Sequence, residues 1–242
     1  MLAIYRKEVN SYLNSLIAYV VLAVFLTGTG LLMWVFPDTG VLSYGIADLS
    51  TLFTLGPYVF MFLIPAITMR SFAEERKAGT MELILTQPVA DWQLVLGKYF
   101  AAWTIVVLTL IPPLVYYISV YQLGNPVGNL DSAGIAGSYI GLILLGGVFT
   151  AVGIFASSLT ENQVIAFILA AFLCFLLYTG FSSLAGLEAW GDSTLLIEKF
   201  GILYHYDSMS RGLIDSRNLL YFITVTTLML LLTQLVLNSR KW

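Results

Sequence analysis

Six long stretches of this sequence contain no charged residue, and each is close to the length of a helix that crosses a lipid bilayer. Such a helix needs about 20 apolar residues. The predicted spans are residues 16–36, 49–69, 99–121, 133–159, 164–186 and 218–237. Charged residues make up 10 % of the chain, against about 25 % in a soluble domain. The sequence therefore predicts an all-α polytopic membrane protein.

The basic residues lie mostly on one side of these spans. If both termini are cytoplasmic, eight of the 11 Lys and Arg residues lie on the cytoplasmic side: Arg6, Lys7, Arg70, Arg76, Lys77, Lys98, Arg240 and Lys241. The segments after the first and third spans contain only acids, namely Asp38, Asp48 and Asp131. Because cytoplasmic loops carry an excess of Lys and Arg, we expect both termini in the cytoplasm.

Two segments outside the spans are also predicted to be helical. Residues 2–15 place Leu2, Tyr5, Val9 and Tyr12 at helical spacing, which predicts an interfacial helix along the membrane surface. The alternative is an extension of the first span into the cytoplasm. Residues 187–217 are too charged and too short in their apolar runs to cross the membrane, so we expect an extracytoplasmic segment of short helices.

The sequence lacks the motifs of several function classes. It contains no GxxxxGK[ST] phosphate loop, HExxH or GxSxG, and its only histidine and cysteine are His205 and Cys174. We therefore predict no catalytic residue, no metal site and no cofactor in this chain. A net charge of −3 argues against a nucleic-acid partner. Uncharged span interiors argue against an ion-coupled transporter, so any driving energy is expected to come from outside the membrane.

Residues 70–98, RSFAEERKAGTMELILTQPVADWQLVLGK, hold eight charged residues between two apolar spans. The second span is predicted to continue into this segment as a helix that ends at Gly79, a residue suited to a C-terminal cap. Thr80 would then cap a short helix that Pro88 ends, and Asp91 would cap the helix leading into the third span. A short helix held across two spans would move both when pushed. The alternative is an interfacial loop that contacts lipid headgroups.

This segment resembles the inner loop of ABC-2 type transporter permeases. The family pattern F-x-x-E-x-x-x-G-T-x-E-L-L-x-x-x-P, followed by G-K, is matched by Phe72, Glu75, Gly79, Thr80, Glu82, Leu83, Pro88, Gly97 and Lys98, with Ile84 in place of the second Leu. Residues 122–175 and 204–222 are similar to the gliding-motility-associated, GldF-like permeases of the Bacteroidetes. The resemblance covers essentially the whole chain. It implies a type V exporter-like permease fold in a bacterial inner membrane.

The resemblance also implies partners. In that family the short helix is a coupling helix that docks on a separate ATP-hydrolysing subunit, which binds ATP and Mg. By position, the coupling candidates are Glu75, Gly79, Thr80, Glu82 and Leu83, together with Thr160, Glu161 and Asn162 in the second inner loop, residues 157–163. Capping explains Thr160 and Asn162 as well as docking does. A second permease copy, or a companion membrane subunit with an extracytoplasmic domain, would complete the complex.

Glycines and prolines in the spans predict packing contacts and hinges. Gly137 and Gly141 form a GxxxG pair, which favours close helix packing within the chain over dimerisation. Proline frees backbone carbonyls and permits kinks. The hinge candidates are Pro57, Pro65, Pro112 and Pro113.

The sequence leaves the substrate and the direction of transport open. An uncharged, aromatic-rich interior would suit a lipid, a lipid-linked glycan or a peptide segment. The preferred function is the permease subunit of an ABC-2 transporter. The alternative is a mechanotransmission or scaffold subunit that relays ATPase-driven motion to an extracytoplasmic partner without moving a solute. An intramembrane enzyme is disfavoured by the missing catalytic residues.

Overall fold

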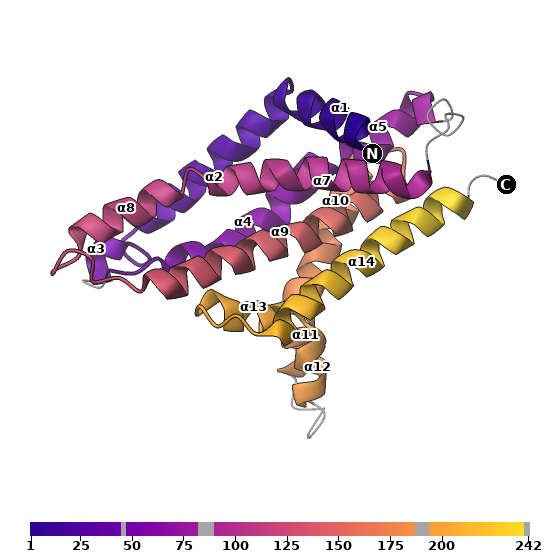
Figure 1. Cartoon of the computed structure of the whole chain (residues 1–242). Helices are drawn as coiled ribbons and strands as arrows, with labels where there is room; N and C mark the ends of the chain where they lie inside the picture. The colour runs from indigo at the N-terminus through magenta and orange to yellow at the C-terminus, as the bar shows by residue number, and fades with distance from the viewer. Residues whose placement is uncertain (45–46, 82–89, 187–193, 240–242) are drawn as a thin grey trace.

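The computed structural model describes residues 1–44, 47–81, 90–186 and 194–239, which fold into a bundle of helices (Figure 1). The described helices are α1 (Leu2–Leu13), α2 (Leu16–Trp34), α3 (Val41–Tyr44), α4 (Ser50–Thr68), α5 (Arg70–Lys77), α7 (Asp91–Leu110), α8 (Leu114–Leu123), α9 (Ser132–Leu159), α10 (Gln163–Phe175), the π-helical turn η1 (Leu176–Gly180), α11 (Phe181–Ala185), α12 (Thr194–Phe200), α13 (Ile202–Ser210) and α14 (Ser216–Ser239).

Six stretches are long and apolar enough to cross a membrane. They are Leu16–Trp34, Ser50–Lys77, Asp91–Leu123, Ser132–Leu159, Gln163–Ala185 and Ser216–Ser239. All the regular structure of the described residues is helical. The predicted all-α fold with six spans is therefore confirmed.

Helix α9 forms the centre of the bundle. It packs against α4, α5 and α7 from the first half of the chain and against α10, α13 and α14 from the second half. Its glycines let these neighbours approach closely. A methyl group added to Gly137 would lie 2.8 Å from Cα of Gly212, and one added to Gly141 would lie 3.0 Å from Cβ of Met209. Both members of the GxxxG pair thus face α13 and the turn after it, within the same chain.

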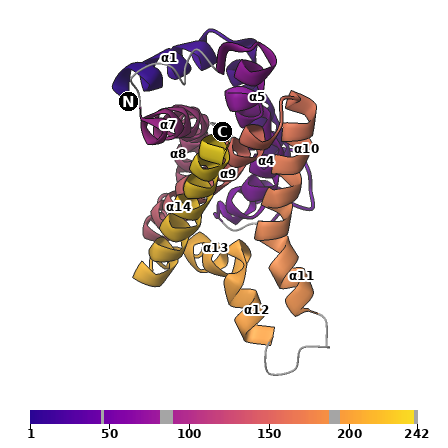
Figure 2. The same cartoon turned by 90° about the vertical axis from the view of Figure 1, so that its right-hand side faces the viewer.

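Helix α1 is separate from the first span. The chain turns at Asn14 and Ser15, where the Ser15 hydroxyl accepts a hydrogen bond from the amide of Ile17 and caps α2. Helix α1 then lies against α7 instead of continuing the line of α2 (Figures 1 and 2). Its Tyr5 hydroxyl is 3.1 Å from Thr104 Oγ1. Helix α1 is therefore not a straight continuation of α2.

The prolines behave differently in the two spans. Helix α4 contains both Pro57 and Pro65 and continues through them without a break. The third span is interrupted where α7 ends at Leu110 and α8 begins at Leu114, with Pro112 and Pro113 between them. Of the hinge candidates, only this second pair coincides with a break between helices.

The start of α7 differs from the prediction by one residue. Asp91 is the first residue of the helix, and Ala90, which has no hydrogen-bonding side chain, occupies the capping position. An acidic residue in the first helical turn still interacts favourably with the helix dipole. The prediction that Asp91 caps this helix was therefore wrong, although its position at the helix start is close to the expected one.

The segment before the last span contains two described short helices, α12 and α13. His205 lies in α13, with Nδ1 2.8 Å from Oδ1 of Asn218 and Nε2 3.0 Å from the carbonyl oxygen of Lys199. Its ring also stacks on Tyr221, with the centroids 3.9 Å apart. The only histidine of the chain thus links α12, α13 and α14.

Candidate functional site

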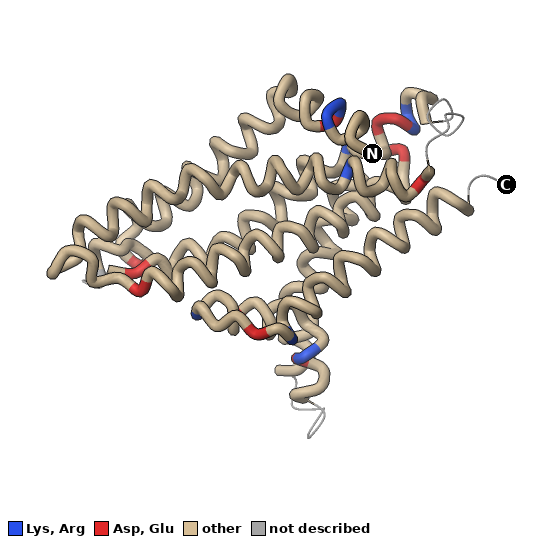
Figure 3. The backbone as a smooth tube through the Cα atoms, in the orientation of Figure 1, with Lys and Arg blue, Asp and Glu red and all other residues tan. Residues whose placement is uncertain are grey.

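The charged residues of the described chain are concentrated outside the middle of the bundle (Figure 3). Helix α1, helix α5, the start of α7 and the end of α14 lie at one end (Figure 1). This charged end carries the basic residues Arg6, Lys7, Arg70, Arg76, Lys77 and Lys98. The acids Asp38, Asp48 and Asp131 lie in the connections at the opposite end. The two predicted inner loops both belong to the charged end.

A buried lysine joins three helices at this end. The Nζ atom of Lys98, on α7, lies 2.8 Å from Oε1 of Glu75 on α5 and 3.1 Å from Oε1 of Glu8 on α1. It also donates to the carbonyl oxygen of Ser71 at 2.7 Å. The Lys98 side chain is 1 % exposed, so its three N–H donors are satisfied by protein acceptors in place of water. We call Lys98, Glu75, Glu8 and Ser71 the Lys98 cluster.

Lys7 forms the exposed edge of this cluster. Its Nζ atom is 3.4 Å from Oε1 of both Glu8 and Glu75, and its side chain is 63 % exposed. Partial burial alone would lower the pKa of Lys7, but these two carboxylates outweigh that effect and raise it. An exposed ion pair of this kind contributes about 0–1 kcal/mol. The buried Lys98 is therefore the cation that holds the helices together.

A serine of α9 fixes the start of α5. The Ser157 hydroxyl accepts hydrogen bonds from the amides of Phe72 and Ala73, at 3.0 and 3.1 Å, and donates to the carbonyl oxygen of Met69 at 2.9 Å. The first turn of a helix presents amides without intrahelical partners. Ser157 satisfies two such amides from a neighbouring helix, so α5 is tied to the end of α9.

Helix α1 makes two further contacts with α5 and its start. The buried Tyr12 hydroxyl lies 3.0 Å from Ser71 Oγ. Burial raises the pKa of Tyr12 far above its ordinary value, so the hydroxyl stays neutral. At the turn after α1, Arg70 donates to Ser15 Oγ at 3.0 Å and pairs with Glu74 at 3.1 Å. Helix α5 is thus held by α1, α7 and α9.

The predicted coupling residues begin within α5 and continue past its end. Glu75 lies inside the Lys98 cluster and is largely buried. Gly79 has a φ of 69°, in the left-handed region that favours glycine at a helix end. Thr80 donates its hydroxyl to the carbonyl oxygen of Glu75 at 3.2 Å, which covers the end of α5. The predicted Glu82, Leu83 and Pro88 lie outside the described residues.

The second predicted loop lies beside α5. Asn162 Oδ1 accepts from the amide of Val164 at 2.9 Å and caps α10. Thr160 Oγ1 accepts from the amide of Asn162 at 3.1 Å. Glu161, between them, is exposed. Helix α5 contacts both α9 and α10, so it lies beside the second loop, in which Thr160 and Asn162 make local capping bonds.

Glu8, Ser71 and Ser157 belong to this site although the sequence did not predict them. A signal existed for Glu8, because it falls between Tyr5 and Tyr12 at spacings of three and four, on the face that α1 packs inward. A carboxylate within an apolar stripe indicates a buried partner. Nothing local to Ser71 or Ser157 indicates their contacts, which form only when helices distant in sequence meet.

The described residues of the charged end form several ion pairs. Within the described part of the chain, no set of three or more His, Cys, Asp and Glu side chains is grouped to hold a metal ion. The charges of the Lys98 cluster join α1, α5 and α7.

Comparison with models of protein families identifies a match over most of the chain. The sequence model of a family described as "ABC-2 family transporter protein" matches residues 37–239, which include every span after the first. A search of curated proteins finds no match. Proteins of that family are permease subunits of ABC transporters, typically non-catalytic, which work in the bilayer with an ABC ATPase. From its six spans and this match, the chain belongs to the ABC-2 family of transporter membrane proteins.

Proposed function

We propose that this permease subunit couples ATP hydrolysis by a separate ATPase subunit to transport across the bacterial inner membrane. The observation that carries the proposal is the buried Lys98 cluster, which connects α5 with α1 and α7. Family membership supplies the ATPase partner, which would bind ATP and Mg. Through the contacts of this cluster, a force applied to α5 would reach the membrane-spanning helices.

The contacts define how such a push would spread. Helix α5 follows α4 directly after Met69, so it is an extension of the second span. Glu75 passes the movement to Lys98 on α7, the start of the third span, and Ser157 passes it to α9, the fourth. Three spans therefore respond to one segment. Buried contacts suit this role because a packed interior transmits strain.

The docking surface we propose is the exposed tip beyond α5. Gly79 and Thr80 are exposed at this tip, and Glu82 and Leu83 follow them in sequence. Glu161 adds a smaller contact from the neighbouring turn. Glu75 is largely buried, so we assign it to transmission within the chain rather than to the docking surface.

We place the charged end and both termini in the cytoplasm. The excess of Lys and Arg at this end supports that orientation. The similarity of residues 122–175 and 204–222 to GldF-like permeases supports an association with gliding motility. The complex would then contain a second permease copy or a companion membrane subunit with an extracytoplasmic domain.

One observation favours mechanotransmission as a second candidate function. Tyr206, on α13 near the opposite end, donates its buried hydroxyl to the carbonyl oxygen of Phe53 on α4 at 2.7 Å. Helix α4 leads into α5, so a movement of that span would carry α13 with it. This linkage would allow the segment before the last span to act on an extracytoplasmic partner without any solute crossing.

Co-purification with the ATPase tests the coupling proposal. The tagged chain is co-expressed with the ATPase and purified in detergent, with Glu82→Lys and a deletion of residues 79–83 in parallel. We expect the wild type to retain the ATPase and both variants to lose it. Glu198→Lys, on α12 outside the charged end, is the control for a general charge effect. Equal retention by all forms would show that this segment does not dock the ATPase.

A transport assay beside an ATPase assay separates the two candidate functions. The complex is reconstituted in liposomes with labelled lipid and peptide probes. Probe movement that depends on ATP hydrolysis supports the permease function. Hydrolysis that depends on the extracytoplasmic partner, with no probe movement, supports mechanotransmission.

A further inference from the structure

The fifth span changes its helical form where it leaves the bundle. The span is Gln163–Ala185, and Leu176–Gly180 within it form the π-helical turn η1 between α10 and α11. Helix α10 packs against α4, α5 and α9, whereas α11 packs against η1 and α12. A π-helical turn inside an α-helix is rare and is frequently found at functional sites. In this span, η1 separates the half that packs on the bundle from the half that packs on α12.

The spacing of the buried residues explains η1. Ala166, Ala170 and Cys174 are the buried residues of α10, and Tyr178 continues their spacing of four. An α-helix has about 3.6 residues per turn, so residues at this spacing drift around the helix. The wider π-helical turn offsets the drift and keeps Tyr178 directed into the bundle, where it is buried.

Tyr178 anchors η1 to three other elements. Its ring packs edge-on against the rings of Tyr58 on α4, Phe149 on α9 and Tyr206 on α13, with the centroids 5.7, 6.1 and 6.1 Å apart. Aromatic pairs in this geometry add to the stabilisation that burial provides. The middle of η1 is therefore fixed to the bundle.

The last residues of η1 are suited to bending. Thr179 donates its hydroxyl to the carbonyl oxygen of Phe175 at 3.0 Å, and this kind of bond from a threonine to the preceding turn often bends a helix. The next residue is Gly180, and glycine stabilises a helix less than other residues except proline. The chain can therefore bend directly after its anchor at Tyr178.

Helices α11 and α12 extend from a narrow base. Phe181 is the first residue of α11, and Gly201 follows the last residue of α12. A methyl group added to Gly201 would lie 3.0 Å from Cβ of Phe181, so the two ends of the pair lie side by side. Among the described residues, Ala185 is the only buried one in α11, and α12 has none. Figure 2 shows both helices extending away from the rest of the bundle.

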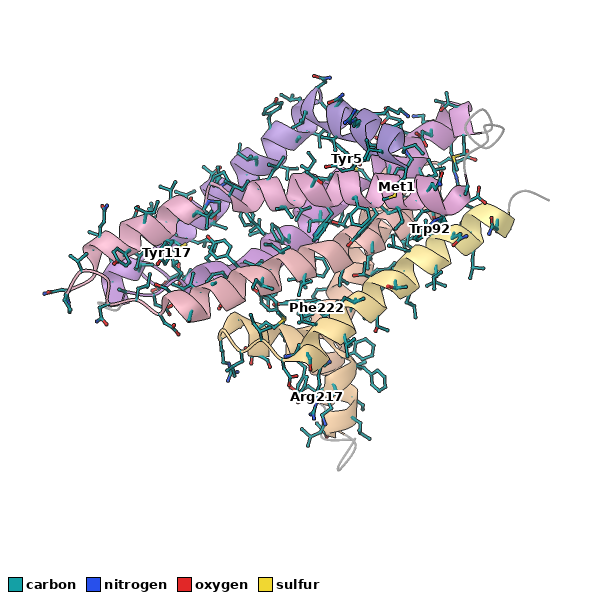
Figure 4. All side chains as sticks on the ribbon, viewed as in Figure 1. Met1, Tyr5, Trp92, Tyr117, Arg217 and Phe222 are labelled. Atoms are coloured by element: carbon teal, nitrogen blue, oxygen red, sulfur yellow. The ribbon has the colours of Figure 1, made fainter. Side chains whose placement is uncertain are left out.

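The end of α12 is also tied to the bundle. Tyr221 of α14 donates its hydroxyl to the carbonyl oxygen of Phe200 at 2.6 Å, and His205 of α13 lies 3.0 Å from the carbonyl oxygen of Lys199. Arg217, labelled in Figure 4, marks the start of α14. Both ends of the pair are therefore held at the base, which allows rotation about the base and opposes translation away from it.

We propose that α11 and α12 tilt together as one unit about this base, with η1 as the joint. Segments with few buried contacts move at low free-energy cost, and such movements are absorbed at a few residues at the end of an element. The joint depends only on η1 and the base. Its use in coupling rests on the proposed function: α5 contacts α10, so a force on α5 would reach η1 along α10.

Distances between spin labels in nanodiscs test the joint. The full chain carries one label at Ile168 on α10 and one at Leu196 on α12, both exposed, and double electron–electron resonance gives their distance distribution. Cys174, the only native cysteine, is buried, so the labels react with the introduced cysteines. A control pair joins Ile168 to Leu220 on α14, also exposed. We expect the α12 pair to give the broader distribution, and equal widths would overturn the proposal.

Two glycines provide matched variants. A methyl group on Gly180 would lie 3.5 Å from Cγ of Leu176, and one on Gly186 would lie 3.6 Å from the carbonyl oxygens of Ser182 and Ser183. Alanine therefore fits at both positions and favours a helix at both, but only Gly180 lies in η1. Gly180→Ala should narrow the distribution of the α12 pair to the width of the control pair, whereas Gly186→Ala should leave it unchanged. Equal effects of the two variants would contradict the joint.

A label pair within the unit tests whether it moves as one. Labels at Leu184 on α11 and Leu196 on α12, both exposed, should give a narrow distribution. A broad one would show that α12 moves by itself and would overturn the proposal. Deletion of Leu176, an exposed residue, removes the extra residue of the π-helical turn. This second variant should narrow the distribution between α10 and α12 as Gly180→Ala does.

The complex with the ATPase separates the joint from its use in coupling. If the proposed function is correct, ATP hydrolysis should shift the mean distance between the labels on α10 and α12, and Gly180→Ala should reduce this shift. A broad distribution that does not shift with ATP would support the joint and contradict its role in coupling. A narrow distribution in the chain alone would overturn the joint whether or not the ATPase binds.

Discussion

Lys98 and Glu75 lie 23 residues apart in the sequence, yet the lysine Nζ atom is 2.8 Å from the glutamate Oε1 atom. The lysine is almost fully buried, and Glu8 contributes a second carboxylate from α1. One ammonium group therefore lies between two carboxylates from two other helices. Removing it would leave the two largely buried carboxylates close together, with only the exposed Lys7 beside them as a cation.

Lys98→Met should destabilise the protein strongly for this reason. Loss of one partner from a buried ion pair costs about 3–5 kcal/mol. Lys7→Met is the matched control, because Lys7 contacts the same two carboxylates from an exposed position, where an ion pair contributes about 0–1 kcal/mol. Thermal unfolding in detergent measures the difference. Similar losses for the two variants would contradict the dominant role of Lys98.

Ser157→Ala should loosen α5 without disturbing α9. The substitution removes the acceptor for the amides of Phe72 and Ala73, and loss of a capping side chain costs about 0.5–2 kcal/mol. Ser158→Ala is the control, because the Ser158 hydroxyl donates to the carbonyl oxygen of Phe155 within its own helix. Hydrogen exchange of residues 70–78 should accelerate in the first variant alone. Equal exchange in both would show that Ser157 does not hold α5.

Gly153→Ala should weaken the packing of α9 on α4. A methyl group there would lie 2.8 Å from Cβ of Thr68, closer than side-chain carbons approach, and the neighbour is buried. Overpacking of this kind costs about 1–3 kcal/mol. Gly28→Ala, on α2, meets nothing within 4 Å, and alanine in a helix gains up to about 1 kcal/mol over glycine. The two variants should therefore change the melting temperature in opposite directions.

Two substitutions in the second loop should have different effects, one on the stability of the protein and the other on ATPase binding. Asn162→Ala removes the cap of α10 and should cost about 1 kcal/mol of stability. Glu161→Lys reverses an exposed charge without removing a capping bond, so it should weaken ATPase binding and leave the melting temperature unchanged. Co-purification and thermal unfolding of both variants test this division. A loss of stability in Glu161→Lys would assign this residue a structural role as well.

The two proline positions should differ in their effect on coupled ATP hydrolysis. Pro112→Ala changes the break between α7 and α8, whereas Pro65→Ala changes a residue inside the unbroken helix α4. If the break is a hinge, permease-dependent hydrolysis should fall in Pro112→Ala and change little in Pro65→Ala. Unchanged hydrolysis in both variants would remove the hinge hypothesis.

Much of the fold could be predicted because a bilayer allows few backbone arrangements. A span must satisfy its own backbone hydrogen bonds, so six uncharged runs of sufficient length become six helices. The glycine at position 79 also predicted the end of α5, and Gly79 adopts a positive φ there. Pro57 and Pro65 do not interrupt α4, which continues through both of them, because spans tolerate proline when nearby groups satisfy the freed carbonyls.

The site could be predicted only in part, because its contacts join distant segments. Glu8 and Lys98 are 90 residues apart, and Ser157 reaches Phe72 across 85 residues. Helical periodicity indicated which face of α1 is apolar, but it does not state that α1 folds back onto α7. The partner of a charged residue on that face is therefore decided by the path of the chain, which one sequence does not reveal.

The central position of α9 has a consequence for synthesis of the protein. Helices α4, α5 and α7 pack on α9 but leave the ribosome before it, while α10, α13 and α14 follow it. The first three spans thus enter the membrane before the helix that organises them exists. Fragments that end before Ser132 should remain poorly packed in the bilayer and exposed to quality-control proteases. Emergence of α9 supplies the surface on which α4, α5 and α7 pack.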